Sequence, residues 1–282
     1  MLYFDWHELA QDNSSLFEKG SAVSIGSFDG LHQGHCALLK RLMDKGRDFG
    51  LPCGVITFSS PPRYLFRSSA PQLISTVRLK KEQLKKLGLD FVIVVDFSLE
   101  FAKMTGDYFL ALLKKYINFK YLLVGEDFRF GRERSSSVED MSELSFKFSF
   151  SFEAFANLQD AKGELKISSS FIRKAIYEGN LKAISSLLQD GVNIDLLDAK
   201  PYCLDEGEMC FLKADLSQVL PKTGEFLGTL CFLNGREKEI KVLFDARCVR
   251  LIYSEKDKYS RDYFGEGEPH LNILKLKEKF KE

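Results

Sequence analysis

Apolar residues recur with two different periods up to about residue 190, and the alternation of these periods predicts strands separated by helices. The expected strands are apolar or β-branched runs at 21–25, 53–58, 91–95 and 121–124. Three helices are expected, because apolar residues there follow a helical spacing. The apolar positions of the first begin at residue 37, and the other two cover 76–87 and 108–116. Strands that alternate with helices imply βαβ units. The sequence therefore predicts an α/β fold with a Rossmann-like, doubly wound parallel sheet.

The pattern changes toward the C-terminus. Phenylalanine alternates with serine over 147–156, which predicts one more strand, and helices are expected at 168–178 and 180–190. Beyond residue 191, glycines separate short segments of alternating apolar and polar residues. We expect the basic C-terminal tail to be helical. We therefore expect two domains, residues 1–190 and a smaller β-rich domain at 191–282.

Composition narrows the class of protein. The 282 residues are 45% hydrophobic, which is enough for a full core. Lys and Arg together number 40, as do Asp and Glu, so no overall field favours nucleic acid or a membrane surface as a partner. The N-terminus lacks the pattern of a signal peptide, no apolar run approaches the about 20 residues that span a bilayer, and the cysteines lack CxxC spacing. We expect a cytoplasmic protein with small-molecule substrates, and its oligomeric state stays open.

The most informative motif is a glycine-rich turn between the first expected strand and the first expected helix. Its sequence, GSFDGLHQGH at 26–35, places His32 and His35 where the helix begins. Backbone N–H groups at such a place bind phosphate, and glycine permits close approach. The histidines could instead bind zinc, but no third ligand stands at metal spacing nearby. The motif favours a nucleoside triphosphate site.

Two further segments carry candidate chemistry, and each has a plain structural alternative. VGEDFRFG at 124–131 is either a strand-to-loop turn or the wall of a nucleotide site, with Asp127 near a metal or ribose. ISSSFIR at 167–173 starts a helix. Its serines are either an ordinary N-cap or hydroxyls that hold phosphate oxygens, in which case Arg173 adds a fixed positive fork.

Together with Thr57-Phe58, these segments resemble the ordered motifs of prokaryotic FAD synthetases, the FMN adenylyltransferase modules that are usually joined to a riboflavin kinase. The resemblance covers about residues 20–190. The HxGH motif alone is shared with other nucleotidyltransferases and with class I tRNA synthetases. The resemblance implies a fold of the nucleotidyltransferase type and transfer of AMP from ATP to FMN, which gives FAD and pyrophosphate.

The resemblance also implies roles for individual residues. His32 and His35 would steady the α- and β-phosphates of ATP, while Ser168, Ser169 and Arg173 would hold the departing phosphates. The remaining positions that match the ATP side are Gly26, Phe28, Asp29, Gly34 and Gly125.

The flavin side and the metal are implied less directly. Phe58, Asp127 and Phe130 match flavin-side positions, although both phenylalanines could equally be core side chains. Mg²⁺ would bridge phosphate oxygens of ATP, with Asp127 as the candidate protein ligand.

The chain also departs from the family pattern. Ser27 stands where Asn is common, and residues 59–62 replace a Glu-Pro-His-Pro segment, which removes a histidine from the flavin side. The Gly-Phe-Pro-Thr-Ala-Asn signature of riboflavin kinases is absent from 191–282. We therefore expect a degenerate kinase-like barrel there. The alternatives are a bifunctional kinase and synthetase, an adenylyltransferase for another substrate, and a catalytically silent flavin-nucleotide regulator.

Overall fold

The described part of the chain forms two compact units. A computed structural model describes residues 1–9, 15–59, 72–158, 167–205, 208–252 and 271–279. The first unit consists of Met1–Ala70 and Lys80–Ile167, and the second of Pro71–Leu79 and Ser168–Glu282. The short segment 71–79, which lies between the two parts of the first unit along the chain, thus belongs to the second unit. The domain boundary at residue 190 stays a prediction.

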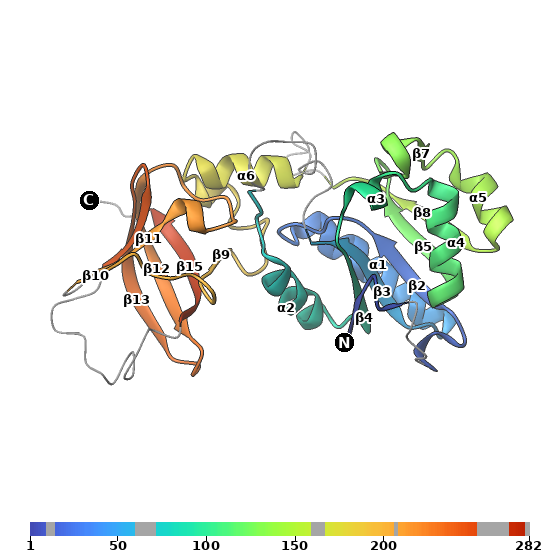
Figure 1. Cartoon of the computed structure of the whole chain (residues 1–282), viewed down its shortest axis with the longest axis horizontal. Helices are drawn as coiled ribbons and strands as arrows, with labels where there is room; N and C mark the ends of the chain where they lie inside the picture. Colours follow the sequence, from blue (N-terminus) through green and yellow to red (C-terminus); the bar gives the residue numbers. More distant parts are fainter. Residues whose placement is uncertain (10–14, 60–71, 159–166, 206–207, 253–270, 280–282) are drawn as a thin grey trace. The chain divides into compact units, whose positions relative to one another are not determined.

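The first unit is built on a sheet in which all neighbouring strands are parallel (Figure 1). From edge to edge, its strands are β1 (Leu2–Asp5), β4 (Phe91–Val95), β3 (Cys53–Phe58), β2 (Ser21–Ile25), β5 (Phe119–Gly125) and β8 (Ser151–Phe155). Both β2 and β4 are buried along their whole length, as expected of strands covered on two faces. The predicted α/β fold with a doubly wound parallel sheet is confirmed.

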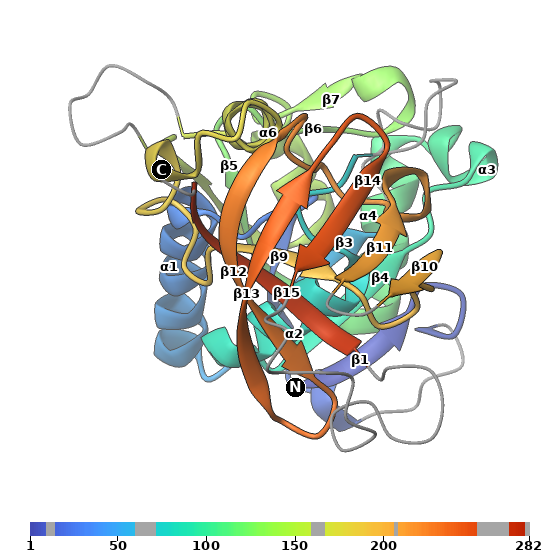
Figure 2. The same ribbon diagram turned by 90° about the vertical axis from the view of Figure 1, so that its left-hand side faces the viewer.

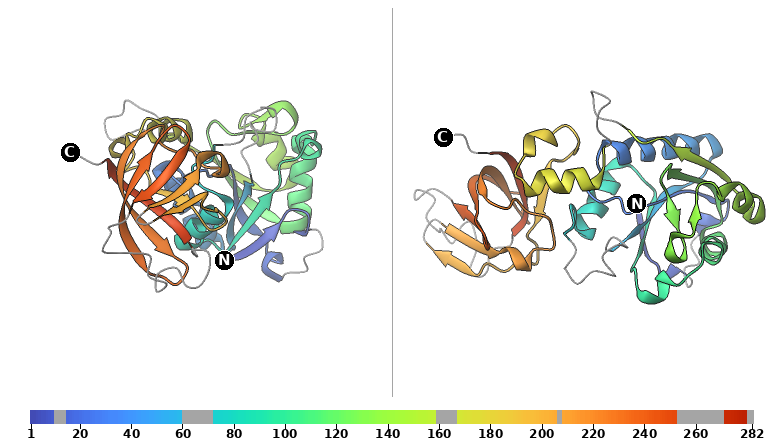
Figure 3. Two further views of the ribbon diagram at one scale, coloured as in Figure 1. Left: turned by 60° about the vertical axis from the view of Figure 1, so that its left-hand side comes forward. Right: turned by 90° about the horizontal axis from the view of Figure 1, so that it is seen from above.

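Helices connect these strands. They are α1 (Gln33–Phe49), α2 (Val77–Leu87), α3 (Leu99–Ala102), α4 (Gly106–Ile117) and α5 (Met141–Phe148). Helix α1, blue in Figure 3, contacts β2, β3 and β5. A Cβ atom on Gly46 of α1 would lie 1.9 Å from Sγ of Cys53, so glycine permits this close approach. Among the described helices, none has the length and apolar character that crossing a bilayer requires.

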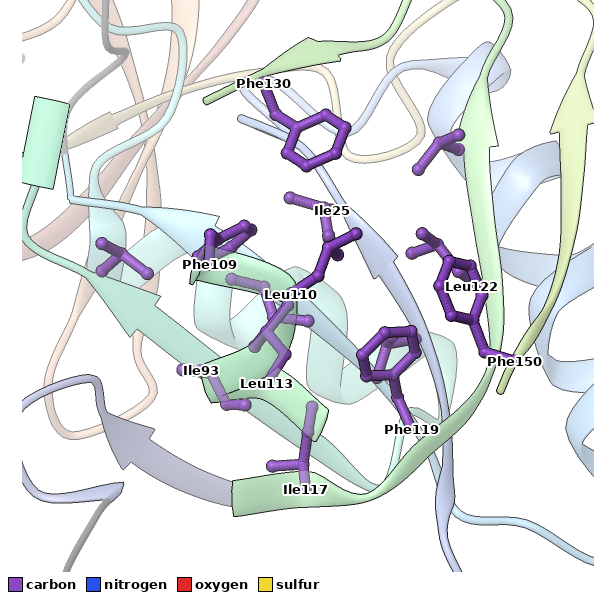
Figure 4. Packing of buried hydrophobic residues seen from close by; sticks show 14 of the residues in the cluster. Ile25, Ile93, Phe109, Leu110, Leu113, Ile117, Phe119, Leu122, Phe130 and Phe150 are labelled. Atoms are coloured by element: carbon purple, nitrogen blue, oxygen red, sulfur yellow. The ribbon is translucent and has the colours of Figure 1, made fainter. Parts of the chain in front are cut away.

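A large apolar core lies between the sheet and α4 (Figure 4). Leu110, Leu113 and Ile117 of α4 belong to it, together with side chains of β2, β4 and β5. Within β2, Val23 and Ile25 belong to this core, whereas Ala22 lies toward Gly46 of α1. This alternation follows from the two-residue period of a strand, and it places α1 and α4 on opposite faces of the sheet.

The order of the strands makes the end of β2 a natural place for a ligand. From β2 the chain continues outward through β3 to β4, and β5 then returns to the other side of β2. In open α/β sheets, ligands bind beyond the carboxyl ends of the strands where the order reverses in this way. The turn that carries His32 follows directly after β2.

The second unit contains a seven-stranded antiparallel sheet (Figure 2). Its strands, from edge to edge, are β10 (Cys203–Asp205), β11 (Glu208–Leu212), β14 (Cys248–Ile252), β13 (Glu237–Phe244), β12 (Gly224–Phe232), β15 (Leu271–Lys279) and β9 (Val192–Asp195). Helix α6 (Ser169–Tyr177) precedes them. The predicted β-rich C-terminal part is confirmed.

Three local predictions are wrong. The tail is not helical, because 271–279 pairs with β12 and β9 as strand β15. The helix expected at 180–190 is reduced to the short 3-10 helix η5 (Leu181–Ala183). The strand expected from residue 147 starts only at Ser151, because α5 extends to Phe148. Ser149, with a φ of 52°, caps the C-terminal end of that helix.

Polar contacts around Asp195 of β9 hold segment 71–79 within the second unit. Arg78 donates to both carboxylate oxygens at 2.5–3.1 Å, and Thr76 Oγ1 donates to one of them at 2.6 Å. Burial raises the pKa of Asp195, but these hydrogen bonds outweigh it and leave the pKa below its ordinary value. Leu73 also forms a β-bridge with Gln218. The segment therefore joins this unit through side chains and backbone alike.

Candidate active site

The turn between β2 and α1 has a strained backbone. Phe28 and Leu31 have φ angles of 44° and 32°, and Gly30 has a φ of 83°. A left-handed conformation costs a non-glycine residue about 1–3 kcal/mol and persists where the surroundings enforce it. The Phe28 side chain is only 2% exposed, and a Cβ atom on Gly26 would come within 3.2 Å of its ring. Glycine at position 26 therefore leaves room for this buried ring.

Two stacked imidazoles stand at the start of α1. His32 is the N-cap residue, and its Nδ1 accepts a hydrogen bond from the backbone N–H of His35 at 3.4 Å. The two ring centroids are 3.7 Å apart with planes inclined by 18°, and Phe28 meets the His35 ring edge-on at 5.3 Å. Because Nδ1 of His32 is an acceptor, the neutral ring carries its proton on Nε2. A Cβ atom on Gly34 would lie 3.2 Å from the His32 ring, so glycine gives that ring space.

Both imidazoles are uncharged near neutral pH. Burial lowers the pKa of His32 to about 4, although the carboxylate of Asp29 acts in the opposite direction. Burial, the neighbouring His32 and the ammonium of Lys80 hold the pKa of His35 well below its ordinary value. Nδ1 of His35 is buried and has no hydrogen-bond partner among the described residues. An anion placed beside this pair would favour its protonation.

A buried lysine, Lys80 of α2, lies near enough to His35 for its charge to act on that imidazole, and it was not predicted from the sequence. Its side chain is 4% exposed, and its Nζ donates to the carbonyl oxygen of Phe58 at 2.9 Å and to Thr57 Oγ1 at 3.2 Å. Thr57 Oγ1 in turn donates to the carbonyl oxygen of Ser27 at 3.0 Å. Burial lowers the pKa of Lys80 to about 8, opposed by Asp29. Lys80 therefore links the end of β3 to the glycine turn.

The sequence did carry a signal for this lysine. Val77, Lys80, Leu84 and Leu87 are spaced by three and four residues, as on the buried stripe of a helix. Leu84 is fully buried. Lysine is almost never fully buried unless it has partners, so a lysine on this stripe indicates a partnered site.

Asp29, which was predicted on the ATP side, is itself buried, with 1% of its surface exposed. Its charge acts on the pKa of both His32 and Lys80. A buried carboxylate would repel phosphate. Asp29 is therefore better suited to stabilise the charged forms of His32 and Lys80 than to contact ATP directly.

The residues that follow β5 occupy two different environments. Asp127 is exposed, and its carboxylate accepts a hydrogen bond from Asn157 Nδ2 at 2.8 Å, beyond the strand end at Gly125. Phe130 is buried in the core, 5.2 Å from Phe128 in a stacked arrangement. Among the described residues, no group of three or more His, Cys, Asp or Glu side chains is arranged to hold a metal ion.

Phe58, the other predicted flavin-side aromatic residue, is half-buried at the end of β3. It meets Phe97 edge-on with centroids 5.6 Å apart. The adjacent Ser59 donates to Asp96 at 2.8 Å. The altered segment at 60–62 lies outside the described residues.

The third predicted segment starts helix α6 in the second unit. Ser168 is the N-cap residue and accepts a hydrogen bond from the backbone N–H of Phe171 at 3.3 Å, and Ser169 is the first helical residue. Arg173 Nε donates to the carbonyl oxygen of Gln72 at 3.1 Å. The histidines belong to the first unit. Their proximity to Arg173 therefore stays a prediction.

Comparison with known proteins identifies the family. The sequence pattern of the family described as "FAD synthetase" matches residues 14–171, which include the glycine turn, both histidines, Lys80 and Ser168. The chain belongs to the FAD synthetase family. The match ends before Arg173 and the antiparallel sheet.

Two relatives of the chain are larger proteins. The bifunctional riboflavin kinase/FMN adenylyltransferase of Escherichia coli K12 is 35% identical over 173 residues, which cover 61% of this chain and 55% of that protein. The protein of the same description from Haemophilus influenzae is 34% identical over 178 residues, 62% of this chain and 57% of that protein. The chain thus spans about half the length of the curated relatives it matches.

A solved structure with a similar fold covers nearly the whole chain. The crystal structure of a macrolide-efflux protein from Streptococcus pneumoniae has a TM-score of 0.78, with 99% of this chain and 100% of that chain covered. The sequences are 21% identical, so this likeness concerns the fold alone.

Proposed function

We propose that the protein is an FMN adenylyltransferase that transfers AMP from ATP to FMN and releases pyrophosphate. The observation that carries this proposal is the stacked, uncharged pair His32 and His35 at the end of β2, in a chain of the FAD synthetase family. Neutral imidazoles can approach a polyanion as hydrogen-bond donors and gain protons as negative charge accumulates on it.

The reaction needs no nucleophile from the protein. A phosphate oxygen of FMN attacks the α-phosphorus of ATP, a new P–O bond forms, and the bond between the α-phosphorus and the oxygen leading to the β-phosphorus breaks. The electron pair of that bond leaves with pyrophosphate. The protein then has to position two phosphates and stabilise the charge that develops between them.

Each side chain has a distinct place in this proposal. His32 presents its Nε2–H to a phosphate oxygen, because its Nδ1 is occupied by the His35 backbone N–H. His35, which packs against Phe28, acts beside it. Ser168, Ser169 and Arg173 hold the leaving phosphates. That last part rests on the resemblance to the family motifs.

Backbone and acidic positions complete the phosphate side. Gly26 directly follows β2, Gly34 lies in the first turn of α1 and Gly125 ends β5, and glycine at these places would let phosphate approach the backbone closely. Asp29 acts through His32 and Lys80, whose pKa values it raises. Mg²⁺, when bound, would neutralise phosphate charge. The exposed carboxylate of Asp127 suits a hydrated ion that the phosphates of ATP carry.

On the flavin side, the burial of the two phenylalanines favours Phe58 over Phe130. Phe58 is half-buried at a strand end, whereas Phe130 is part of the core. We propose that Phe58 contacts the isoalloxazine ring and that Phe130 supports the wall behind it.

We propose no kinase activity for residues 191–282, which lack the riboflavin kinase signature and lie beyond the family match. The test is to incubate the purified full chain with Mg-ATP and either FMN or riboflavin, and then to separate the flavins by chromatography. We expect FAD from FMN and no FMN from riboflavin. FMN formed from riboflavin would show a bifunctional enzyme, and tight binding of FMN and ATP without pyrophosphate would show a silent regulator. Turnover of nicotinate mononucleotide or phosphopantetheine in place of FMN would assign another adenylyltransferase.

A further inference from the structure

We propose that Lys80 is a positioning residue for the histidine pair and supplies, near neutral pH, the positive charge that His32 and His35 cannot both carry. The inference deepens the proposed function and rests on it, because it concerns the same phosphate site. Three features of the first unit carry it: a chain of hydrogen bonds, the charges around the lysine, and its place on α2.

The chain of hydrogen bonds reaches from the lysine to the strained turn. Lys80 Nζ donates to Thr57 Oγ1, and Thr57 Oγ1 donates to the carbonyl oxygen of Ser27. Ser27 directly precedes Phe28, whose left-handed backbone packs its ring against His35. A strained turn needs contacts that enforce it. This chain of hydrogen bonds is such a contact, and it connects α2 to Ser27, the residue before Phe28.

The charges around Lys80 explain why an ammonium stands here. The groups whose charges act on the lysine and the pair are Asp29 before α1, His32 and His35 at its start, and Lys80 itself on α2. With ring centroids 3.7 Å apart, two protonated imidazoles would repel each other strongly. The pair can therefore take up one proton far more easily than two. The protonated ammonium of Lys80 would therefore give a phosphate at this site a positive charge that does not depend on protonation of a histidine.

The position on α2 argues against a purely structural lysine. Lys80 takes a place on the apolar stripe that leucine or methionine would fill without burying a charge. A buried ammonium is unfavourable unless it is hydrogen-bonded, and here Thr57 and Phe58 provide acceptors. Packing alone does not require this residue type.

The first arm of the test needs no substrate. The histidine rings of the full chain are followed by NMR as a function of pH in the wild-type protein, in Lys80→Met, and in Lys85→Met, which removes an exposed lysine of the same helix. Without the ammonium of Lys80, we expect the pKa of His35 to be higher in Lys80→Met than in the wild-type protein, although burial and His32 still hold it down. We expect no shift in Lys85→Met. An unchanged His35 titration in folded Lys80→Met would overturn the proposal.

If Lys80→Met does not fold, the wild-type protein carries the same test. Raising the pH through about 8 removes the charge of Lys80 without any substitution. The ring resonances of His35 should then show a second change in chemical shift, with its midpoint near pH 8. Resonances that stay constant between pH 7 and 9 (roughly one unit on either side of that midpoint) would contradict the coupling.

The second arm is catalytic and separates this inference from the proposed function. We expect Lys80→Met to lower kcat for FAD formation about 10–100-fold with a smaller change in KM, and Lys80→Arg to retain more activity than Lys80→Met. Lys85→Met should match the wild type. No FAD from the wild-type protein would defeat the proposed function and leave the NMR arm to decide the role of Lys80. Full activity of folded Lys80→Met would defeat the role of Lys80 and leave the proposed function standing.

Discussion

At the scale of single residues, burial decides what the histidine pair can do. The sequence placed His32 and His35 at the start of a helix, because a glycine turn between a strand and a helix is a local pattern. Their lowered pKa values arise from burial and, for His35, also from the neighbouring His32 and from Lys80, a residue far along the chain. Such long-range contacts leave only a weak trace in a single sequence. The lysine on the buried stripe of α2 is that trace.

The low pKa of His32 predicts a specific dependence of stability on pH. Its folded-state pKa of about 4 lies below the ordinary value of 6.5, so the unfolded chain binds more protons between these values. The free energy of unfolding should therefore fall as the pH drops from about 6.5 to 4, by about 3 kcal/mol from this group, and His35 should act in the same direction.

This dependence can be measured with matched variants. His32→Asn keeps a side-chain acceptor at the helix N-cap but removes the titrating ring. Urea unfolding at several pH values should show a shallower loss of stability in acid for His32→Asn than for the wild type or His7→Asn, which changes an exposed histidine. Equal acid sensitivity in all three proteins would show that His32 is not the group responsible.

At the scale of elements, the central parallel strands were predictable, whereas the edge strand β1 and three later segments were not. Strand β4 is a continuous apolar run and β2 and β3 are mostly apolar or β-branched, and the structure begins and ends each of the three where the pattern does. The runs around α5 and β15 are ambiguous, because alternating and helical spacings coexist over a few residues. Pairing with β12 and β9, which no local pattern contains, makes 271–279 a strand.

Helix α1 offers a test of how closely an element is fitted to the sheet. Helix propensity alone favours Gly46→Ala by about 1 kcal/mol. The new Cβ atom, however, would meet Cys53 Sγ at 1.9 Å and the Leu51 carbonyl oxygen at 3.0 Å. We expect a net loss of about 1–3 kcal/mol in the free energy of unfolding.

A double-mutant cycle identifies the cause. Adding Cys53→Ala removes the sulfur, so the double variant should lose less than the sum of the two single variants in urea unfolding. A Gly46→Ala protein as stable as the wild type would show that α1 is not held this closely.

At the scale of the whole molecule, the division of the chain could not be foreseen from composition. The sequence changes texture near residue 191, yet residues 71–79 and the segment from 168 onward belong to the second unit. Arg78 and Thr76 join Asp195 across more than a hundred residues of chain. The two histidines belong to the first unit, whereas Ser168, Ser169 and Arg173 belong to the second.

The most direct test compares FAD formation by the wild-type protein, His35→Ala and His7→Ala under saturating Mg-ATP and FMN, with folding checked by circular dichroism. Removing one preorganised donor to the transferring phosphates typically lowers the rate by about 10²–10³. We expect a loss of that size for His35→Ala and none for His7→Ala, whose imidazole is exposed. Wild-type rates of FAD formation by a folded His35→Ala protein would contradict the central claim that the stacked histidines hold the reacting phosphates.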